Sequence, residues 1–332
     1  MTAAPLVELD RLEVHFPVRS RGLFRRVVGR IHAVDGIDLT IRRGETLGLV
    51  GESGSGKTTL GRAVLRAVPV TGGTLRFHTA DGPVDLLALR GEDLRRFRRH
   101  MQLVFQDPYA SLDPRMTVRD IIAEPLEAPG LVKSRAEADE RVREIAARCR
   151  INIEYLRRFP HAFSGGQRQR IGIARALVAH PEFVVCDEAV SALDVSIQAD
   201  ILNLLMDLQD ELGTTYLFIT HDLAVVGQIA NRVAVMYLGR IVELAPTAEL
   251  FRRPLHPYTR ALFSAIPSLE GRARRKAILV GGEIPDPAHP PSGCRFHTRC
   301  PFVRDRCREE TPPLRELAPG HRAACHFAEE LA

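Results

Sequence analysis

Apolar residues along the chain follow two patterns, short uninterrupted runs and longer segments with helical spacing. The runs at 47–50 and 183–186 have the length of buried strands, and glycine-rich or polar residues follow each directly. Residues 134–149 and 196–213 place apolar side chains on one face of a helix, and the second helix ends at Gly213. We therefore predict an α/β fold in which buried parallel strands alternate with amphipathic helices.

The pattern changes after residue 245. Residues 1–245 contain the strand and helix signals, with a mostly helical insert at about 107–180. Residues 246–332 hold a short helix between prolines, the stiff stretch "IPDPAHPP" and four of the chain's six cysteines. The sequence predicts a main domain over 1–245 and a small C-terminal extension over 246–332.

Composition indicates the class of protein and the cellular compartment to expect. It has 332 residues, 45% of them hydrophobic and 26% charged, with a formal net charge of +5, all ordinary for a globular protein. The N-terminus lacks the apolar core of a signal peptide, and no segment approaches the roughly 18 consecutive apolar residues of a membrane helix. We therefore expect a cytosolic chain, in which clustered cysteines indicate a metal site before disulfides.

The stretch "LGLVGESGSGKTTL" carries the strongest signal for chemistry. It fits the phosphate-binding pattern G-x-x-x-x-G-K-[ST]. In that pattern glycines let backbone N–H groups turn toward a phosphate, the lysine reaches the β- and γ-phosphates, and the hydroxyl holds Mg²⁺. The N-terminus of the following helix points its positive end at the same anion. The predicted nucleotide-binding residues here are Gly51, Glu52, Ser53, Gly54, Ser55, Gly56, Lys57, Thr58 and Thr59.

Two adjacent carboxylates follow the apolar run at 183–186. Asp187, at the end of the predicted strand, can hold the Mg²⁺ shell, and Glu188 can polarise an attacking water. Phosphoryl transfer depends on positioning and charge neutralisation, which these groups supply beside a phosphate loop. Cys186 in the run and Cys149 in an amphipathic helix are predicted to be structural residues.

A second predicted anion site lies in "FSGGQRQRIGIARAL". Ser164, Gly165, Gly166 and Gln167 stand at the start of a predicted helix, where a serine and two glycines favour an anion. The chain already has one phosphate loop. A second anion site is most simply explained by a dimer, in which it closes on the nucleotide held by the partner.

Together these motifs resemble the ATP-binding subunit of an ABC transporter. The resemblance covers residues 1 to about 250 and rests on the order and spacing of the motifs. It implies an ABC-type nucleotide-binding domain with a RecA-like core, an antiparallel β subdomain and a helical subdomain. The implied catalytic residues are Glu188, the switch histidine His221 and the Q-loop glutamine Gln106. The implied Mg²⁺ ligands are Thr58, Gln106 and Asp187. The remaining implied ATP contacts are Asp194 of the D-loop "SALD" and Phe16, the candidate for adenine stacking.

The C-terminal part resembles the extension of peptide-importer ATPases, through "HPYT" at 256–259, the prolines and the late cysteines. "MQLVFQDPYASLDPRMTV" and "ESGSGKTTLGRAVLR" are similar to the F-type member of the oligopeptide and dipeptide pair. The resemblance implies an ATPase that powers the import of short peptides from the cytoplasmic face of the membrane. Two alternatives stay open: nickel or another small solute as cargo, and a soluble ABC ATPase outside any transporter.

The same resemblance implies a set of partners. They are two membrane permeases, which would contact residues 109–116, a second ATPase subunit (a D-type paralogue or a second copy), and indirectly an extracytoplasmic peptide-binding protein. The basic stretch 19–30 lacks an aromatic stacking platform, so we predict no binding to nucleic acid.

The late cysteines have the spacing C-x5-C-x6-C-x17-C, which suits one metal centre. The C-x-x-C pairs typical of structural zinc are absent, and nearby arginines can offset thiolate charge. With the peptide-importer resemblance, this favours a [4Fe–4S] cluster, with Zn²⁺ as the alternative. We predict a structural role without direct part in hydrolysis, because the extension is too short and polar to form a core unaided. The predicted ligands are Cys294, Cys300, Cys307 and Cys325.

Overall fold

The computed structural model describes residues 4–20, 26–264 and 281–331. The chain divides into two compact units. The first unit consists of Met1–Leu6, Ile41–Thr46 and Ala88–Ile219, and the second of Val7–Thr40, Leu47–Leu87 and Thr220–Ala332. Of the basic stretch 19–30, residues 21–25 lie outside the described residues.

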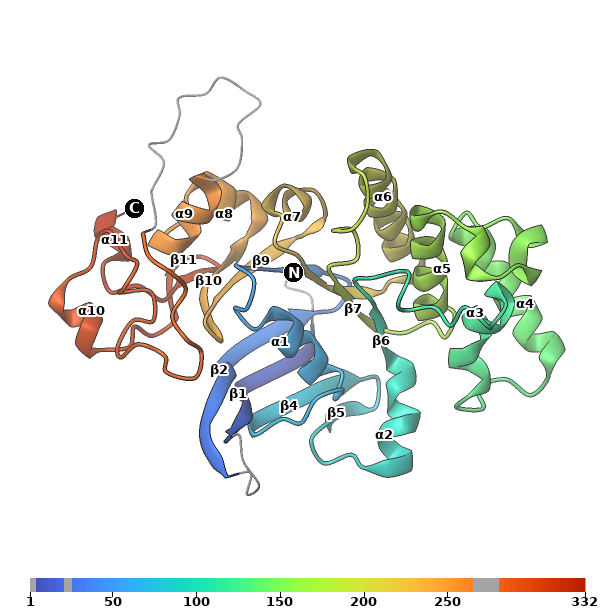
Figure 1. The fold of residues 1–332 in the computed structure, drawn as a ribbon, viewed down its shortest axis with the longest axis horizontal. Coiled ribbons are helices and arrows are strands. Elements are labelled where there is room, and N and C mark those ends of the chain that lie inside the picture. Colours follow the sequence, from blue (N-terminus) through green and yellow to red (C-terminus); the bar gives the residue numbers. More distant parts are fainter. Residues whose placement is uncertain (1–3, 21–25, 265–280, 332) are drawn as a thin grey trace. The chain divides into compact units, whose positions relative to one another are not determined.

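The first unit contains a run of parallel strands. In spatial order these are β8 (Thr215–Ile219), β7 (Phe183–Asp187) and β6 (Met101–Val104) (Figure 1). Val185 of β7 pairs with Leu103 on one side and with Leu217 on the other. Every residue of β7 and β8 is buried. This confirms the buried parallel strand that the apolar run at 183–186 predicts.

Helices make up most of the rest of the first unit. The helix predicted at 196–213 is α6 (Val195–Leu212), which ends at Gly213 in the left-handed conformation with φ of 67°. Thr117 and Ser134 cap the N-termini of α3 (Val118–Glu127) and α4 (Arg135–Arg148) through their hydroxyl oxygens. The other helical elements, several of them close together in Figure 1, are α2 (Gly91–Phe97), η1 (Arg98–His100), α3 (Val118–Glu127), α4 (Arg135–Arg148), η2 (Ile153–Arg157), η3 (Pro160–Ala162) and α5 (Gly165–Leu177).

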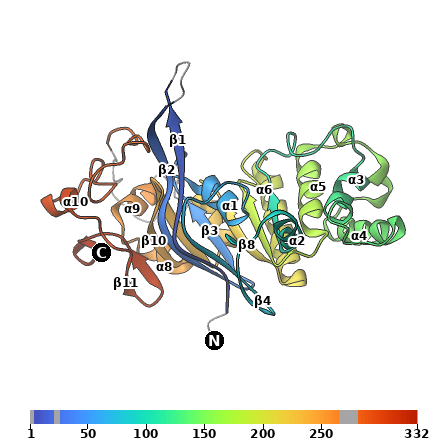
Figure 2. The ribbon, with the colours of Figure 1, turned by 90° about the horizontal axis from the view of Figure 1, so that it is seen from below.

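The second unit contains an antiparallel sheet in the spatial order β2 (Val27–Arg42), β1 (Pro5–Arg19), β4 (Gly72–Thr79) and β5 (Gly82–Asp85). Figure 2 shows its two long strands side by side, β1 (Pro5–Arg19) and β2 (Val27–Arg42). β4 (Gly72–Thr79) pairs with β1, and β5 (Gly82–Asp85) pairs with β4. Buried residues alternate with more exposed ones along parts of these strands, as expected for a sheet with one face on a core.

A second group of strands in this unit carries the phosphate loop and receives the C-terminal extension. β3 (Thr46–Val50) lies parallel to β9 (Arg232–Tyr237), and β10 (Arg240–Pro246) returns antiparallel to β9. β12 (His321–Ala323) then pairs with β10, and β11 (Arg315–Ala318) pairs with β12. Residues from the predicted extension therefore continue this sheet. The helices of the unit are α1 (Lys57–Val64), α7 (Leu223–Ile229), α8 (Thr247–Arg252), α9 (Pro257–Ser264), α10 (Asp305–Glu309) and α11 (Ala328–Leu331).

A fully buried glutamate anchors the extension on β10. Glu243 accepts backbone hydrogen bonds from Leu255 (2.6 Å) and His256 (2.9 Å), and His321 Nε2 lies 2.8 Å from its Oε1. Burial lowers the pKa of His256 to about 4, so this imidazole is neutral at physiological pH. The glutamate thus ties together β10, the start of α9 and β12.

The extension also contributes to the apolar core of the second unit. Phe296 is fully buried, and its ring centroid lies 5.3 Å from that of Tyr237 and 5.4 Å from that of Tyr258. Cys294 and Cys300 pack against the same cluster. The expectation that the extension lacks a core of its own is therefore incomplete, because the extension shares a core with β9 and β10.

Candidate nucleotide-binding site

Two glycines give the phosphate loop its shape. Gly51 has a φ of 154°, and a Cβ atom there would stand 2.2 Å from the carbonyl oxygen of Met236. Gly56 has a φ of 105°, and its Cβ would stand 2.0 Å from the carbonyl oxygen of Ala33. Both contacts are far inside van der Waals distance, and both φ values lie where side chains are disfavoured. Any other residue at either position would displace the loop.

Polar groups converge inside this loop. Lys57 is buried at the start of α1, and its Nζ donates to the carbonyl oxygens of Gly51 (2.7 Å) and Glu52 (2.9 Å). The buried hydroxyl of Ser55 has no hydrogen-bond partner within the part of the chain that the structure describes. A lysine folded over the loop, an unpaired hydroxyl and a helix N-terminus fit a bound phosphate group. Thr58 and Thr59 follow in the first turn of α1, and both are half-buried.

The acidic pair lies in the first unit. Asp187 is the buried last residue of β7. Glu188 follows with a φ of 50°, uncommon for a residue with a side chain, and its N–H donates to the carbonyl of Ile219 at 2.9 Å. Gln106 Nε2 donates to Glu188 Oε2 at 2.9 Å. The structure thus brings Gln106 and Glu188 together, and it holds Glu188 in a strained backbone conformation of a kind that is common at functional sites.

The predicted second anion site is a capped helix N-terminus. Ser164 Oγ accepts from the N–H of Gln167 at 3.4 Å, and Gln167 Oε1 accepts from the N–H of Ser164 at 2.9 Å, which is a capping box. A Cβ at Gly166 would meet Cγ2 of Ile197 at 2.5 Å, so glycine lets α6 approach this turn closely. The 13-residue helix α5 therefore begins with a rigid, glycine-lined turn that favours an anion.

The other predicted site residues are placed as follows. Asp194 is the exposed residue before α6. His221 is exposed in the turn between β8 and α7, where the neighbouring Asp222 caps α7 through Oδ1 at 2.8 Å from the N–H of Ala224. Phe16 is half-buried on β1. Phe16, His221 and the phosphate loop belong to the second unit, whereas Asp194 and the acidic pair belong to the first.

Sequence reasoning missed two residues of the extension that contact the phosphate loop. Arg299 forms an ion pair with Glu52, and Tyr258 accepts a hydrogen bond from the N–H of Glu52. Tyr258 belongs to the "HPYT" stretch, which marks the extension in the sequence without indicating what it touches. No local pattern links Arg299 to residue 52.

The four late cysteines gather around one small cavity in the second unit. They line a space of about 20 Å³ together with aromatic and histidine side chains. Burial, opposed in part by a backbone hydrogen bond, raises the pKa of Cys294 to about 12 and that of Cys300 to about 11, and it also raises the pKa of Cys325. Each of these three thiols also feels the other cysteines of the group. The structure therefore brings together the cysteines that their spacing predicts as one group.

Two arginines expected to offset thiolate charge are engaged elsewhere. Arg295 pairs with Asp35 and donates to the carbonyl of Leu238, and Arg299 pairs with Glu52. Cys325 has Arg315 and Arg260 nearby, and these arginines work against the rise of its pKa. The remaining two cysteines, Cys149 and Cys186, are fully buried, and burial raises the pKa of each to about 12, which confirms their structural character.

The fold and this site are those of a phosphate-loop nucleotide-binding protein. The family described as "ABC transporter" matches residues 34–191, and "Oligopeptide/dipeptide transporter, C-terminal region" matches residues 242–307. The oligopeptide transport ATP-binding protein AppF of Bacillus subtilis (strain 168) is 50% identical over 333 residues, which cover 98% of this chain and 99% of AppF. A putative peptide import ATP-binding protein of Brucella ovis is 51% identical over 325 residues, 98% of each chain. The chain belongs to the ATP-binding subunits of the ABC transporter family.

Solved structures agree with this assignment. The dimeric, post-hydrolysis ATP-binding cassette MJ0796 bound to ADP and Pi is 26% identical with a TM-score of 0.62, over 73% of this chain and 99% of that one. The cbiO1 protein of Clostridium perfringens, part of the ABC transporter complex cbiONQ, is 27% identical with a TM-score of 0.63, over 75% of this chain and 91% of that one. The predicted cassette fold, the ATPase activity coupled to transport and the use of ATP and Mg²⁺ are thereby confirmed. No helix among the described residues has the length and apolar character needed to span a membrane.

Proposed function

We propose that this chain is the ATP-hydrolysing subunit that powers import of short peptides, bound peripherally to its permeases at the cytoplasmic face of the membrane. The observation that carries the proposal is the joint presence, along nearly the whole chain, of an ABC nucleotide site and the oligopeptide/dipeptide C-terminal region. The relatives are named for oligopeptide transport or peptide import. Nickel cargo and a non-transport role have no comparable support.

The described side chains suggest how ATP is held and hydrolysed. Lys57, now folded over the phosphate loop, would turn to the β- and γ-phosphates, with backbone N–H groups of the loop and of α1 around them. Mg²⁺ would be held by Thr58, Gln106 and Asp187, hard oxygen ligands that suit it. Glu188 would orient and polarise the attacking water.

We further propose that two ATPase subunits form a closed dimer on ATP. The start of α5 offers an anion site without a phosphate loop of its own, so it would close on the nucleotide of the facing subunit together with Asp194. His221 would contact the γ-phosphate within its own subunit. The rigid capping box at Ser164 supports this role, because a preformed anion site needs little reordering on closure. The partner is a D-type paralogue or a second copy of this chain.

The permeases would dock on the segment that follows Gln106. Tyr109 of the predicted contact segment 109–116 is 61% exposed, and Phe105, just before Gln106, is 43% exposed. The guanidinium of Arg168, on α5, lies 4.0 Å from the centroid of the Tyr109 ring, and that of Arg175 lies 5.3 Å from the Phe105 ring. This surface joins the proposed permease contact to the helix that begins at the second anion site. Exposed aromatic and arginine side chains are typical of protein interfaces.

Reconstitution tests the transport function. The chain is purified with two permease subunits and a second ATPase subunit and placed in proteoliposomes. A peptide-binding protein and radiolabelled short peptides are then supplied. We expect ATP-dependent peptide uptake that falls at least about a hundredfold in Lys57→Ala, because the phosphate contact is lost, and stays unchanged in the exposed Lys133→Ala control. Uptake of labelled nickel without peptide uptake would contradict the proposal that short peptides are the cargo. ATPase activity that does not respond to any permease would contradict the assignment to a transporter.

We also propose that Cys294, Cys300, Cys307 and Cys325 hold one [4Fe–4S] cluster. All four line one cavity, and because cysteine binds a metal as thiolate, a bound metal would supply the driving force for ionisation. A tetrahedral zinc site with Zn–S bonds of about 2.3 Å places its sulfurs about 3.8 Å apart. Among the described cysteines, no three Sγ atoms all lie within 4.8 Å of one another. The side chains thus do not preform a tetrahedral zinc site, and the absence of C-x-x-C pairs also supports a cluster over a single zinc ion.

Metal analysis tests this centre. Protein purified without oxygen is expected to be brown and to hold about four iron and four sulfide ions per chain. Cys300→Ser should lose most of the iron, whereas Cys149→Ala, at a buried cysteine outside the group, should keep it. A colourless protein with one zinc ion per chain would show that the site binds zinc and not a cluster. Protein without any metal would contradict the proposed metal site.

A further inference from the structure

The second residue of the phosphate loop is held by the C-terminal extension at two points. Arg299 donates from both terminal nitrogens to Glu52, at 2.7 Å to Oε2 and 3.1 Å to Oε1, which is a bidentate ion pair. Tyr258 Oη accepts from the backbone N–H of Glu52 at 2.8 Å. Both the side chain and the main chain of residue 52 are therefore fixed by residues roughly 200 to 250 positions later in the sequence.

These contacts are largely shielded from water. The Arg299 side chain is 8% exposed and that of Glu52 is 28% exposed. Tyr258 is buried, and Tyr237 Oη lies 3.4 Å from Arg299 NH1. Water screens such a pair less than it screens a surface ion pair, and removing one partner leaves the other charge uncompensated.

We propose that Arg299 and Tyr258 are positioning residues for ATP, which act through Glu52. Lys57 donates to the carbonyl of the same residue, so Glu52 is the point where the extension and the phosphate-binding lysine meet. Without Arg299, the Glu52 carboxylate would stand unneutralised in the loop that receives a polyphosphate, and it would repel the ligand. Tyr258 fixes the direction of the chain as it leaves Gly51, and so the direction in which the following N–H groups point.

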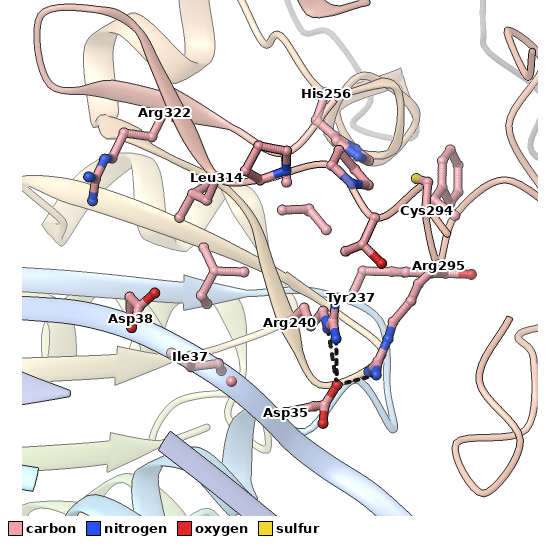
Figure 3. Close-up of a pocket in the computed structure, with 18 of the residues that line it drawn as sticks. Asp35, Ile37, Asp38, Tyr237, Arg240, His256, Cys294, Arg295, Leu314 and Arg322 are labelled. Carbon is pink, nitrogen blue, oxygen red and sulfur yellow. Dashed lines mark hydrogen bonds and ion pairs between the residues drawn. The ribbon is translucent and has the colours of Figure 1, made fainter. Parts of the chain in front are cut away.

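The same contacts connect the cysteine group to the nucleotide site. Arg299 immediately precedes Cys300, and Arg295 immediately follows Cys294. Figure 3 shows Arg295 and Arg240 converging on Asp35 of β2, with Arg240 Nε at 3.1 Å from Asp35 Oδ2. The segment between Cys294 and Cys300 is thus bound to β2 through Arg295 and to the phosphate loop through Arg299. Loss of the metal would therefore release Arg299 and loosen the loop; this second step rests on the metal centre proposed above.

A double-mutant cycle in the full-length chain tests the first step. The dissociation constant of MgATP is measured by calorimetry for Arg299→Ala, Glu52→Gln and the double variant. We expect Arg299→Ala to weaken binding at least about tenfold and Glu52→Gln to change it by less than about threefold. The double variant should return close to Glu52→Gln, because no charge remains uncompensated. Tyr258→Phe, which keeps the ring, should weaken binding about threefold or more.

Control and rescue variants separate positioning from general stability. Arg304→Ala removes another arginine of the extension, one that pairs with Glu330 at 2.6 Å and not with Glu52, and it should leave ATP binding unchanged. Arg299→Lys keeps the charge and should recover part of the affinity. Wild-type affinity in Arg299→Ala would overturn the proposal. So would equal impairment of Arg299→Ala and the double variant, since the loss would then come from packing and not from Glu52.

The second step has its own readout. Cys300→Ser should lose iron and weaken ATP binding, whereas Arg299→Ala should weaken ATP binding with its iron retained. If Cys300→Ser loses iron and binds ATP normally, the coupling to the metal is wrong while the positioning role stands. If wild-type protein holds no metal, the proposed centre fails, and the Arg299→Ala result alone decides the positioning role.

Discussion

Replacing Glu188 by glutamine is expected to slow ATP hydrolysis at least about a hundredfold while MgATP still binds. A carboxamide has nearly the shape of the carboxylate and can keep its place at the end of β7, including the contact with Gln106. It cannot polarise water, because it lacks the negative charge and the basicity of the carboxylate. The loss should therefore appear in the turnover number and not in the affinity for ATP.

The measurement is steady-state phosphate release by the reconstituted transporter, with ATP binding followed separately. Glu211→Gln provides a matched control, because Glu211 is an exposed carboxylate of α6 in the same unit, paired with Arg148 at 3.3 Å. Its turnover should equal that of the unmodified protein. A turnover in Glu188→Gln within about twofold of the unmodified protein would remove Glu188 from the mechanism.

The parts of the site that follow from short stretches of sequence could be predicted. The phosphate loop needs glycine at positions where a Cβ would overlap a carbonyl oxygen, so Gly51 and Gly56 leave a visible pattern. The strand before the acidic pair is buried on both faces and reads as a continuous apolar run. Gly213 ends α6 because a left-handed residue is needed there. In each case a local steric or burial requirement restricts the residue type.

The contacts between distant segments could not be predicted in the same way. The Gln106–Glu188 bond spans 82 positions and the Arg299–Glu52 pair spans 247. Many pairs of polar residues with side chains of suitable length could make such a contact. No sequence periodicity therefore predicts it. The pairing of β12 with β10 also could not be predicted, because a strand of three residues is too short to show an alternation of apolar and polar residues. The extension therefore looked separate in the sequence although it shares the sheet and core of the second unit.

The signature turn is built from residues at the starts of α5 and α6. Ser164 is exposed, and its hydroxyl and backbone are used to shape the first turn of α5. Gly166 lies against Ile197 at the start of α6, close in sequence to Asp194. The signature and the D-loop thus form one preorganised surface within the first unit. In the proposed closed dimer, this surface would contact the nucleotide that the facing subunit holds.

Replacing Ser164 by arginine is therefore expected to leave ATP binding by the isolated chain within about threefold and to prevent ATP-dependent dimer closure. The arginine side chain would fill the space above the first turn of α5 that the facing nucleotide needs. Binding is measured by calorimetry and closure by light scattering with MgATP in a Glu188→Gln background. Ser134→Arg is the matched control, because it also removes a serine cap, at α4, at a cost of about 1 kcal/mol. It should close normally. A loss of nucleotide binding in Ser164→Arg as severe as in Lys57→Ala would contradict the composite site, since the signature would then serve the nucleotide of its own chain.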